Sequence, residues 1–329
     1  MKKLLLCVTC LFGVTVNAQK LPVWQDPNVN QQNREERRAD FFAFESMESA
    51  KGEKSSSTRF LSMEGTWKFN FVKDHQNAPK DFFTLKYDDS KWEDFPVPGL
   101  FEVNGYGDMI YKNVGYSWGP TFKSNPPYVS ETNNYTGSYR RTFDLPADWK
   151  GQEVFFHVGS ATSNLSLWVN GKYVGYSEDS KIAAEFNITK YLKPGKNLIA
   201  MQIMRWCDGT YLEDQDFWRF TGIAREVYLY ATPKTHIKDI SIDQDWQDGK
   251  GLLNVDVKVV GGKADVEAQL LDANGQQVAE GLQAVVENAK AWSAEVPNLY
   301  TLFITLKKDN EILEVVKKKV GFRHIEIKG

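Results

Sequence analysis

The sequence has few of the residues that build disulfides and transition-metal sites. Its 329 residues include 3 cysteines and 4 histidines. Cys7 and Cys10 have CxxC spacing, but they lie in an N-terminal stretch with the pattern of a cleaved signal, so no metal or redox role is expected for them. Cys207 is then the one cysteine of the mature chain, which excludes an intrachain disulfide. The histidines, at positions 75, 157, 236 and 324, are too scattered for a dedicated metal site.

Other absences narrow the function further. The 40 basic and 43 acidic residues are spread along the chain and give a net charge of −3, so there is no basic stripe and nucleic acid is not expected as a partner. The mature chain lacks a run of the roughly 18 apolar residues that a membrane-spanning helix needs, so a membrane is not expected as a partner either. It also lacks GxSxG, a P-loop and a GxGxxG after a predicted strand, the common signatures of serine hydrolases and nucleotide-binding proteins.

The first residues have the three parts of a secretory signal peptide. Lys2 and Lys3 form a positive start, residues 4–16 are apolar, and Val16-Asn17-Ala18 is a small-residue cleavage site. The sequence therefore predicts a signal peptide over residues 1–18, with cleavage after Ala18. We expect the mature protein to be exported, to the periplasm or the extracellular space.

The mature chain shows the two-residue alternation of β-strands almost throughout and little helical periodicity. Trp67, Phe69 and Phe71, for example, alternate with polar residues, as expected when one face of a sheet is buried. Asn170-Gly171 lies between two such runs and favours a type I′ hairpin turn. The predicted fold class is all-β.

The predicted strands form two sets, separated near Thr232-Pro233. Residues 60–232 are rich in aromatics and have long irregular stretches, which predicts a jelly-roll sandwich with functional loops. Residues 233–324 have about seven short strands, the pattern of an immunoglobulin-like β-sandwich without its disulfide. Residues 19–59 are predicted to be an irregular lead-in. Residues 325–329 begin another alternating strand without a partner, and we expect them to start a missing downstream domain.

The segment RWCDGTYLEDQDFWR, residues 205–219, concentrates carboxylates, large aromatics and arginines in one loop after a predicted strand. Carboxylates bind sugar hydroxyls and aromatic rings stack on sugar faces, so the segment indicates carbohydrate binding. The alternative is structural: the acidic side chains pair with arginines to brace the loop. The residues concerned are Glu213, Asp214 and Asp216, with Arg205, Arg219 and Arg225. The spacing gives no support for a catalytic carboxylate pair.

Several long motifs resemble, in order, the opening of the large bacterial β-galactosidases of glycoside hydrolase family two. They cover nearly all of the mature chain. The motifs are WQDPNVNQQNR (24–34), GTWKF (65–69), PVPG (96–99), GYG (105–107), IYKNV (110–114), NPP (125–127), GSYR (137–140), VNGKYVGYSEDS (169–180), residues 205–219, GIAR (222–225), WSAEVPNLY (292–300) and VGFR (320–323).

This resemblance implies a sugar-binding, galactose-binding-like jelly roll and an immunoglobulin-like sandwich, followed in the family by a (β/α)₈ catalytic barrel. The acid/base and nucleophile glutamates and the magnesium ligands of the family lie in that barrel, which needs about 250 residues. No catalytic residue is therefore assigned to this chain, and we expect the chain alone to be inactive.

Two positions match family residues that contact the galactosyl group. Asp208 matches an aspartate that reaches into the active site of the barrel and helps to hold a sodium ion. Asn113 matches an asparagine that hydrogen-bonds the same sugar. Both roles suit the chemistry, because a carboxylate accepts hydroxyl donors and is a hard ligand for sodium, whereas an amide donates and accepts.

Three interpretations stay open. The first is the non-catalytic N-terminal part of an exported, retaining enzyme that hydrolyses terminal non-reducing β-D-galactosides, with the missing barrel of the same polypeptide as its partner. The second is a stand-alone exported module that binds a galactoside or another β-linked glycan. The third is a degraded gene product. Residues 24–34 also resemble a segment that makes subunit contacts in tetrameric relatives, so a homo-oligomer is compatible with the sequence.

Overall fold

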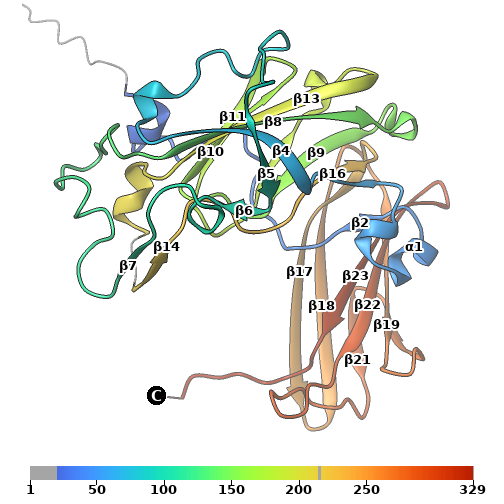
Figure 1. The fold of residues 1–329 in the computed structure, drawn as a ribbon. Coiled ribbons are helices and arrows are strands. Elements are labelled where there is room, and N and C mark those ends of the chain that lie inside the picture. The colour runs from blue at the N-terminus through green and yellow to red at the C-terminus, as the bar shows by residue number, and fades with distance from the viewer. Residues whose placement is uncertain (1–20, 214–215, 329) are drawn as a thin grey trace, which may run out of the picture.

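Two β-sandwiches follow one another along the chain in the computed structural model, which describes residues 21–213 and 216–328 (Figure 1). The predicted signal peptide and Asp214 lie outside the described residues. All strand pairs are antiparallel within the described part, and helices are short, which confirms the all-β fold class. No helix of these residues is long and apolar enough to cross a membrane.

The first sandwich packs a seven-stranded sheet against a four-stranded one. The larger sheet has the order β1 (Gln31–Gln32), β11 (Lys172–Glu178), β10 (Asn164–Val169), β13 (Gly195–Met204), β8 (Thr136–Leu145), β4 (Gly65–Val72) and β5 (Glu93–Val97). The smaller sheet has the order β12 (Ala184–Asn187), β9 (Glu153–Val158), β16 (Val227–Thr232) and β3 (Phe60–Ser62). Two short ribbons complete it: β7 (Ile110–Lys112) with β14 (Phe217–Arg219), and β6 (Gly99–Leu100) with β15 (Gly222–Ile223).

The core of this sandwich combines aliphatic side chains with many aromatic rings, among them those that the alternation in β4 predicts. Trp67 and Phe69 are each 1% exposed, and Phe69 stacks on Phe95 with ring centroids 4.3 Å apart. The Asn170-Gly171 turn between β10 and β11 has φ values of 51° and 82°, the positive values that a type I′ turn requires. Local sequence signals therefore predicted these strands and this turn correctly.

The second sandwich has an aliphatic core between a three-stranded and a five-stranded sheet. The first sheet has the order β17 (His236–Gln247), β18 (Lys250–Val260) and β21 (Gln283–Val286). The second has the order β2 (Ala43–Phe44), β23 (Glu311–Val320), β22 (Tyr300–Lys308), β19 (Asp265–Leu271) and β20 (Gln277–Glu280). Seven of these strands come from residues 236–320, and β2 comes from the lead-in.

The remaining regular elements are single helical turns. They are α1 (Met47–Lys51) and the 3₁₀ turns η1 (Val23–Gln25), η2 (Lys54–Ser56), η3 (His75–Asn77), η4 (Glu102–Asn104), η5 (Ala147–Trp149), η6 (Thr189–Tyr191) and η7 (Asp208–Tyr211). Residues 321–328 form no strand, contrary to the strand expected from Ile325 onward, because they have no partner strand in the described part of the chain. Ile325 and Ile327 are accordingly exposed, at 69% and 99%.

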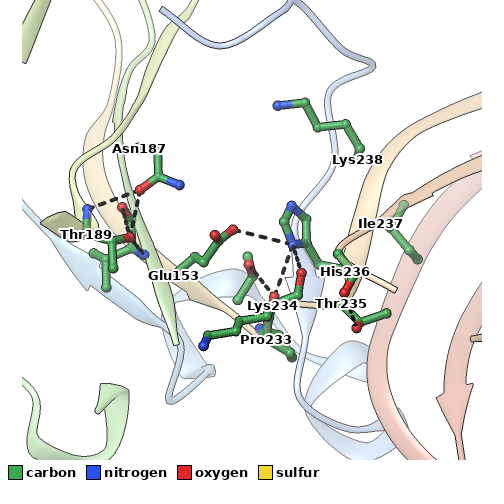
Figure 2. Close-up of polar contacts among 12 residues, drawn as sticks. Glu153, Asn187, Thr189, Pro233, Lys234, Thr235, His236, Ile237 and Lys238 are labelled. Carbon is green, nitrogen blue, oxygen red and sulfur yellow. Dashed lines mark hydrogen bonds and ion pairs between the residues drawn. The ribbon is translucent and has the colours of Figure 1, made fainter. Parts of the chain in front are cut away.

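The connection between the two sandwiches is held by contacts around His236 (Figure 2). The Nδ1 atom of His236 lies 3.0 Å from the carbonyl oxygen of Pro233 and 3.2 Å from that of Lys234. Since a carbonyl oxygen only accepts, Nδ1 carries the hydrogen. The carboxylate of Glu153, on β9 of the first sandwich, lies 3.8 Å from the same nitrogen. These contacts join the start of β17 to the first sandwich.

The lead-in is the second connection, and it is more ordered than the sequence predicts. Residues 29–44, which we call the strap, begin with β1 at the edge of the first sandwich and end with β2 at the edge of the second. Arg38, in the middle, donates from Nε and Nη2 to the two carboxylate oxygens of Glu185 on β12, at 2.8 Å each. Both side chains are nearly buried, with exposures of 13% and 10%.

His157 on β9 adds a third member to this buried group. Its Nδ1 lies 3.0 Å from Oε1 of Glu185. Burial alone would raise the pKa of Glu185, but the hydrogen bond with His157 and the charge of Arg38 outweigh burial and lower that pKa to about 2. Glu185 is therefore ionised in the folded protein, and its charge depends on Arg38 for compensation.

Replacing Arg38 should destabilise the protein strongly. Arg38→Met leaves the Glu185 carboxylate buried without its main cation, and breaking such a pair costs about 3 kcal/mol or more. We expect a lower midpoint of urea unfolding. Lys51→Met is the matched control, because the Lys51–Glu48 pair is exposed and such pairs contribute about 1 kcal/mol or less. Equal effects of the two substitutions would contradict this account of the strap.

Candidate functional site

The segment that carries Asp208 leaves the first sandwich at the end of β13 and is anchored there by a buried tryptophan. Trp206 is fully buried, and its backbone is bracketed by Asn134: the Trp206 N–H donates to Oδ1 of Asn134 at 2.8 Å, and Nδ2 of Asn134 donates to the Trp206 carbonyl at 3.0 Å. Two residues later the chain enters η7. Asp208 lies at its first position and is partly exposed. The carboxylate is thus presented at the surface from a rigid base.

Asp208 has a second carboxyl group beside it, from Glu178 at the end of β11. Oxygen atoms of these two side chains and Sγ of Cys207 all lie within 4.8 Å of one another. The Tyr176 hydroxyl donates to Oε1 of Glu178 at 2.5 Å. A Cβ at Gly209 would come within 3.0 Å of Oε2 of Glu178, so glycine allows the two segments to approach this closely. The sequence patterns gave Glu178 no role, because it lies on a different strand from Asp208.

The carboxyl group of Glu178 stays protonated at neutral pH. Burial of this side chain, with 8% exposure, raises its pKa to about 8, and the neighbouring charges of Asp208 and Glu213 act in the same direction. Cys207 is also buried, and burial raises the pKa of its thiol. At neutral pH the cluster therefore contains the neutral carboxyl of Glu178 and the neutral thiol of Cys207, beside the side chain of Asp208.

Asn113 lies at the other side of this region, directly after β7. Strands β7 and β14 form a short two-stranded ribbon (Figure 1). In this ribbon Tyr111 pairs with Trp218, and their ring centroids are 5.4 Å apart. Both rings are about half exposed, and the Tyr111 hydroxyl donates to Oδ1 of Asp216 at 3.2 Å. Asn113 is exposed beside this aromatic pair. The ribbon therefore offers an aromatic surface with amide and carboxylate groups at its edge.

Arg205 connects the two loops that carry Asp208 and Asn113. It is 3% exposed, directly precedes Trp206, and donates from Nη2 to the carbonyl of Asp108 at 2.7 Å, just before β7. Asp108 also accepts a 2.7 Å hydrogen bond from the Tyr135 hydroxyl. Arg205 thus links the segment that leads to Asp208 with the segment that leads to β7 and Asn113. No hydrogen bond between the side chains of Asn113 and Asp208 is present among the described residues.

The predicted bracing of the loop by ion pairs with arginine is wrong for Glu213 and Asp216. Glu213 instead accepts from the N–H and the hydroxyl of Ser180, at 2.7 and 2.5 Å, and Asp216 accepts from Tyr111. Among the described residues, the carboxylate nearest to Arg205 is Glu102, whose Oε1 lies 4.0 Å from Nη2. Hydroxyl donors contact Glu213 and Asp216, whereas Arg205 donates to the carbonyl of Asp108 and Arg225 to the carbonyl of Lys181.

Comparison with known proteins identifies the family. The family model described as "Glycosyl hydrolases family 2, sugar binding domain" matches residues 60–233, and the model "Glycosyl hydrolases family 2" matches residues 235–323. The chain belongs to glycosyl hydrolase family 2. Its two sandwiches are thus the family's sugar-binding jelly-roll domain and immunoglobulin-like domain.

The similar curated proteins of this family are bacterial β-galactosidases. A β-galactosidase of Priestia megaterium (strain DSM 319 / IMG 1521) is 37% identical over 97% of this chain, which matches 33% of that protein. One of Clostridium acetobutylicum is 36% identical over 95% of the chain and 36% of that protein. The β-galactosidase large subunit of Leuconostoc lactis is 32% identical over 83% of the chain and 48% of that protein. The chain thus spans about a third to a half of these relatives.

Among solved structures, bacterial β-glucuronidases share the fold. The apo β-glucuronidase of Ruminococcus gnavus matches with a TM-score of 0.64 and 23% identity, over 82% of this chain and 46% of that chain. A β-glucuronidase of an uncultured Clostridium sp. matches with a TM-score of 0.62 and 22% identity, over 82% of this chain and 45% of that chain. At this identity the likeness concerns the fold alone.

The cluster fits a sodium ion only in part. Asp208 offers a hard oxygen ligand, and protonated Glu178 can offer a neutral oxygen. The buried thiol of Cys207 is a soft ligand that does not suit sodium. The described residues near Asp208 therefore supply part of a sodium coordination shell, and the other ligands would have to come from elsewhere.

Glu178→Gln should stabilise the protein at alkaline pH and have little effect at pH 5. Burial raises the pKa of Glu178 from its ordinary value near 4.5 to about 8. The stability that this group contributes is therefore fully present below pH 4.5 and is lost as the pH rises through 8. Glutamine keeps the shape of the protonated form. We expect a gain of about 4 kcal/mol at pH 9, because each unit of the pKa shift is worth about 1.4 kcal/mol, and thermal unfolding at both pH values measures it. Glu64→Gln, at an exposed position, is the control, and an equal gain at pH 5 would contradict the assignment.

Proposed function

We propose that this chain provides the non-catalytic N-terminal domains of a retaining β-galactosidase that hydrolyses terminal non-reducing β-D-galactosides. Support comes from β-galactosidases as the similar curated proteins, at 37% and 36% identity over nearly the whole chain. In this proposal the catalytic glutamates and the magnesium ligands belong to a barrel domain in the rest of a longer polypeptide. The chain by itself then does not cleave, and its sugar contacts are completed by the barrel.

Within that enzyme, Asp208 and Asn113 contact the galactosyl hydroxyls. The observation that carries this assignment is the rigid presentation of a partly exposed Asp208 carboxylate above buried Trp206, beside protonated Glu178. Asp208 accepts from sugar hydroxyls, and Asn113 can donate and accept at once. Asp208 also holds the sodium ion, with further ligands from the barrel. Arg205 fixes the loops that carry Asp208 and Asn113 relative to each other through its hydrogen bond to the Asp108 carbonyl.

A second candidate is a stand-alone carbohydrate-binding module. The exposed Tyr111–Trp218 pair favours it, because half-exposed aromatic rings with polar groups at their edge are suited to stacking on a sugar face. In this case the chain binds a β-linked glycan without a barrel.

A hydrolysis assay tests the first proposal. The purified chain should release no product from a nitrophenyl β-galactoside, because it has no assigned acid and nucleophile pair. Turnover that Asp208→Ala abolishes would overturn the proposal that these domains are non-catalytic.

Galactose titration distinguishes the two candidates. Calorimetric heat at millimolar galactose or below, lost in Asp208→Ala or Trp218→Ala, favours the module, and no heat favours domains that need the barrel. Lys172→Ala, an exposed substitution on β11, is the control and should change neither result.

Export should be visible at the N-terminus of the mature protein. We propose that a secreting bacterial host removes residues 1–18, so that N-terminal sequencing of the secreted chain begins at Gln19. Ala18→Arg is expected to block cleavage and leave a longer precursor. Recovery of uncleaved wild-type chain starting at Met1 from the exported fraction would contradict the signal-peptide assignment.

A further inference from the structure

A cleft of about 390 Å³ lies between the strap and the smaller sheet of the first sandwich, a size within the range of ligand pockets. One wall consists of strap residues 35–40, and the other of residues 181–183 and the adjoining strands β9 and β12. Arg225 and Glu226, just before β16, complete the lining. Nothing in the proposed function uses this cleft.

Most charged side chains that line the cleft are neutralised by ion pairs within the protein. The pairs are Glu35–Lys238, Glu36–Lys258, Arg37–Asp179, Arg38–Glu185 and Glu226–Lys54. Within residues 21–213 and 216–328, three charged lining residues have no ion pair: Lys181, Arg225 and Asp40. Two cations and one anion leave an excess of one positive charge.

The two cations are neighbours, and each is held in place. Arg225 donates from Nη1 to the carbonyl oxygen of Lys181 at 2.7 Å, which brings both residues to one side of the cleft. The Lys181 ammonium lies 5.0 Å from the centroid of the Phe217 ring. Burial and the charges of Arg219 and Arg225 lower the pKa of Lys181, whereas Glu213 raises it. A bound anion would relieve the repulsion among these cations.

We propose that this cleft binds an acidic saccharide, with Lys181 and Arg225 gripping its carboxylate or sulfate group. Arg225 can donate two parallel hydrogen bonds to such a group, and Lys181 contributes a second positive charge. Asp40 and the polar strap wall provide acceptors for sugar hydroxyls. The assignment of the ligand as a saccharide rests on the proposed function.

The position of the cleft links it to the candidate galactose site. Lys181 contacts Phe217 of β14, the same short strand whose Trp218 faces Tyr111 beside Asn113. A saccharide chain that passes over β14 can therefore reach both places. The cleft would select glycans that carry an acidic residue near the galactoside.

Calorimetric titration of the chain with three probes tests the proposal: D-galacturonate, D-galactose and inorganic sulfate. We expect galacturonate to bind more tightly than galactose at low ionic strength and to weaken when salt is added. Lys181→Met and Arg225→Gln should each weaken galacturonate at least about tenfold, which corresponds to about 1.4 kcal/mol. Lys172→Met, an exposed lysine on β11 outside the cleft, should have no effect.

The Asp208→Asn variant distinguishes binding in the cleft from binding at the candidate galactose site. In Asp208→Asn, galacturonate should still bind, even if all galactose heat is lost, because Asp208 is not part of the cleft. Galacturonate that binds no better than galactose would overturn the proposal, as would an effect of Lys172→Met equal to that of Lys181→Met. Binding of sulfate without binding of galacturonate would overturn the saccharide assignment.

Discussion

The burial of Glu185 as an ionised carboxylate is the constraint on which the arrangement of the two sandwiches depends. A buried carboxylate is stable only when cations and hydrogen-bond donors surround it, and here these come from Arg38 of the strap and His157 of β9. Because Arg38 must stay at that place, the strap must run across the smaller sheet of the first sandwich. Its two ends then pair with edge strands of different sandwiches and cover both edges.

The candidate site lies on loops that rigid sheets hold in place. The aromatic core fixes β13 and β11, and their ends bring Asp208 and Glu178 together. Buried Trp206 and Arg205 then fix the loops beyond the strands. The side chains that remain at the surface, including Asn113, Tyr111 and Trp218, are those suited to contact a ligand or another domain. The candidate binding residues of this family 2 chain thus lie on loops that are fixed by packing against the core.

The cleft beneath the strap has the same structural origin. Four charged residues of the strap, Glu35 to Arg38, form ion pairs with the two sandwiches. On the facing wall, Lys181 and Arg225 have no carboxylate partner among the described residues. The proposed acidic ligand supplies the negative charge that these two adjacent cations lack.

The sequence alone determined the features that depend on neighbouring residues. Alternation predicted the strands of both sandwiches, Asn170-Gly171 predicted its turn, and the ordered motifs from residues 24–34 to 320–323 predicted the family. Only the tertiary structure decided how Arg38 pairs with Glu185, 147 residues away, and why Glu213 accepts from Ser180 and not from an arginine. It also decided that Glu178 lies against Asp208. Local patterns specify which face of a strand is buried, but which charges meet is set by the pairing of distant strands.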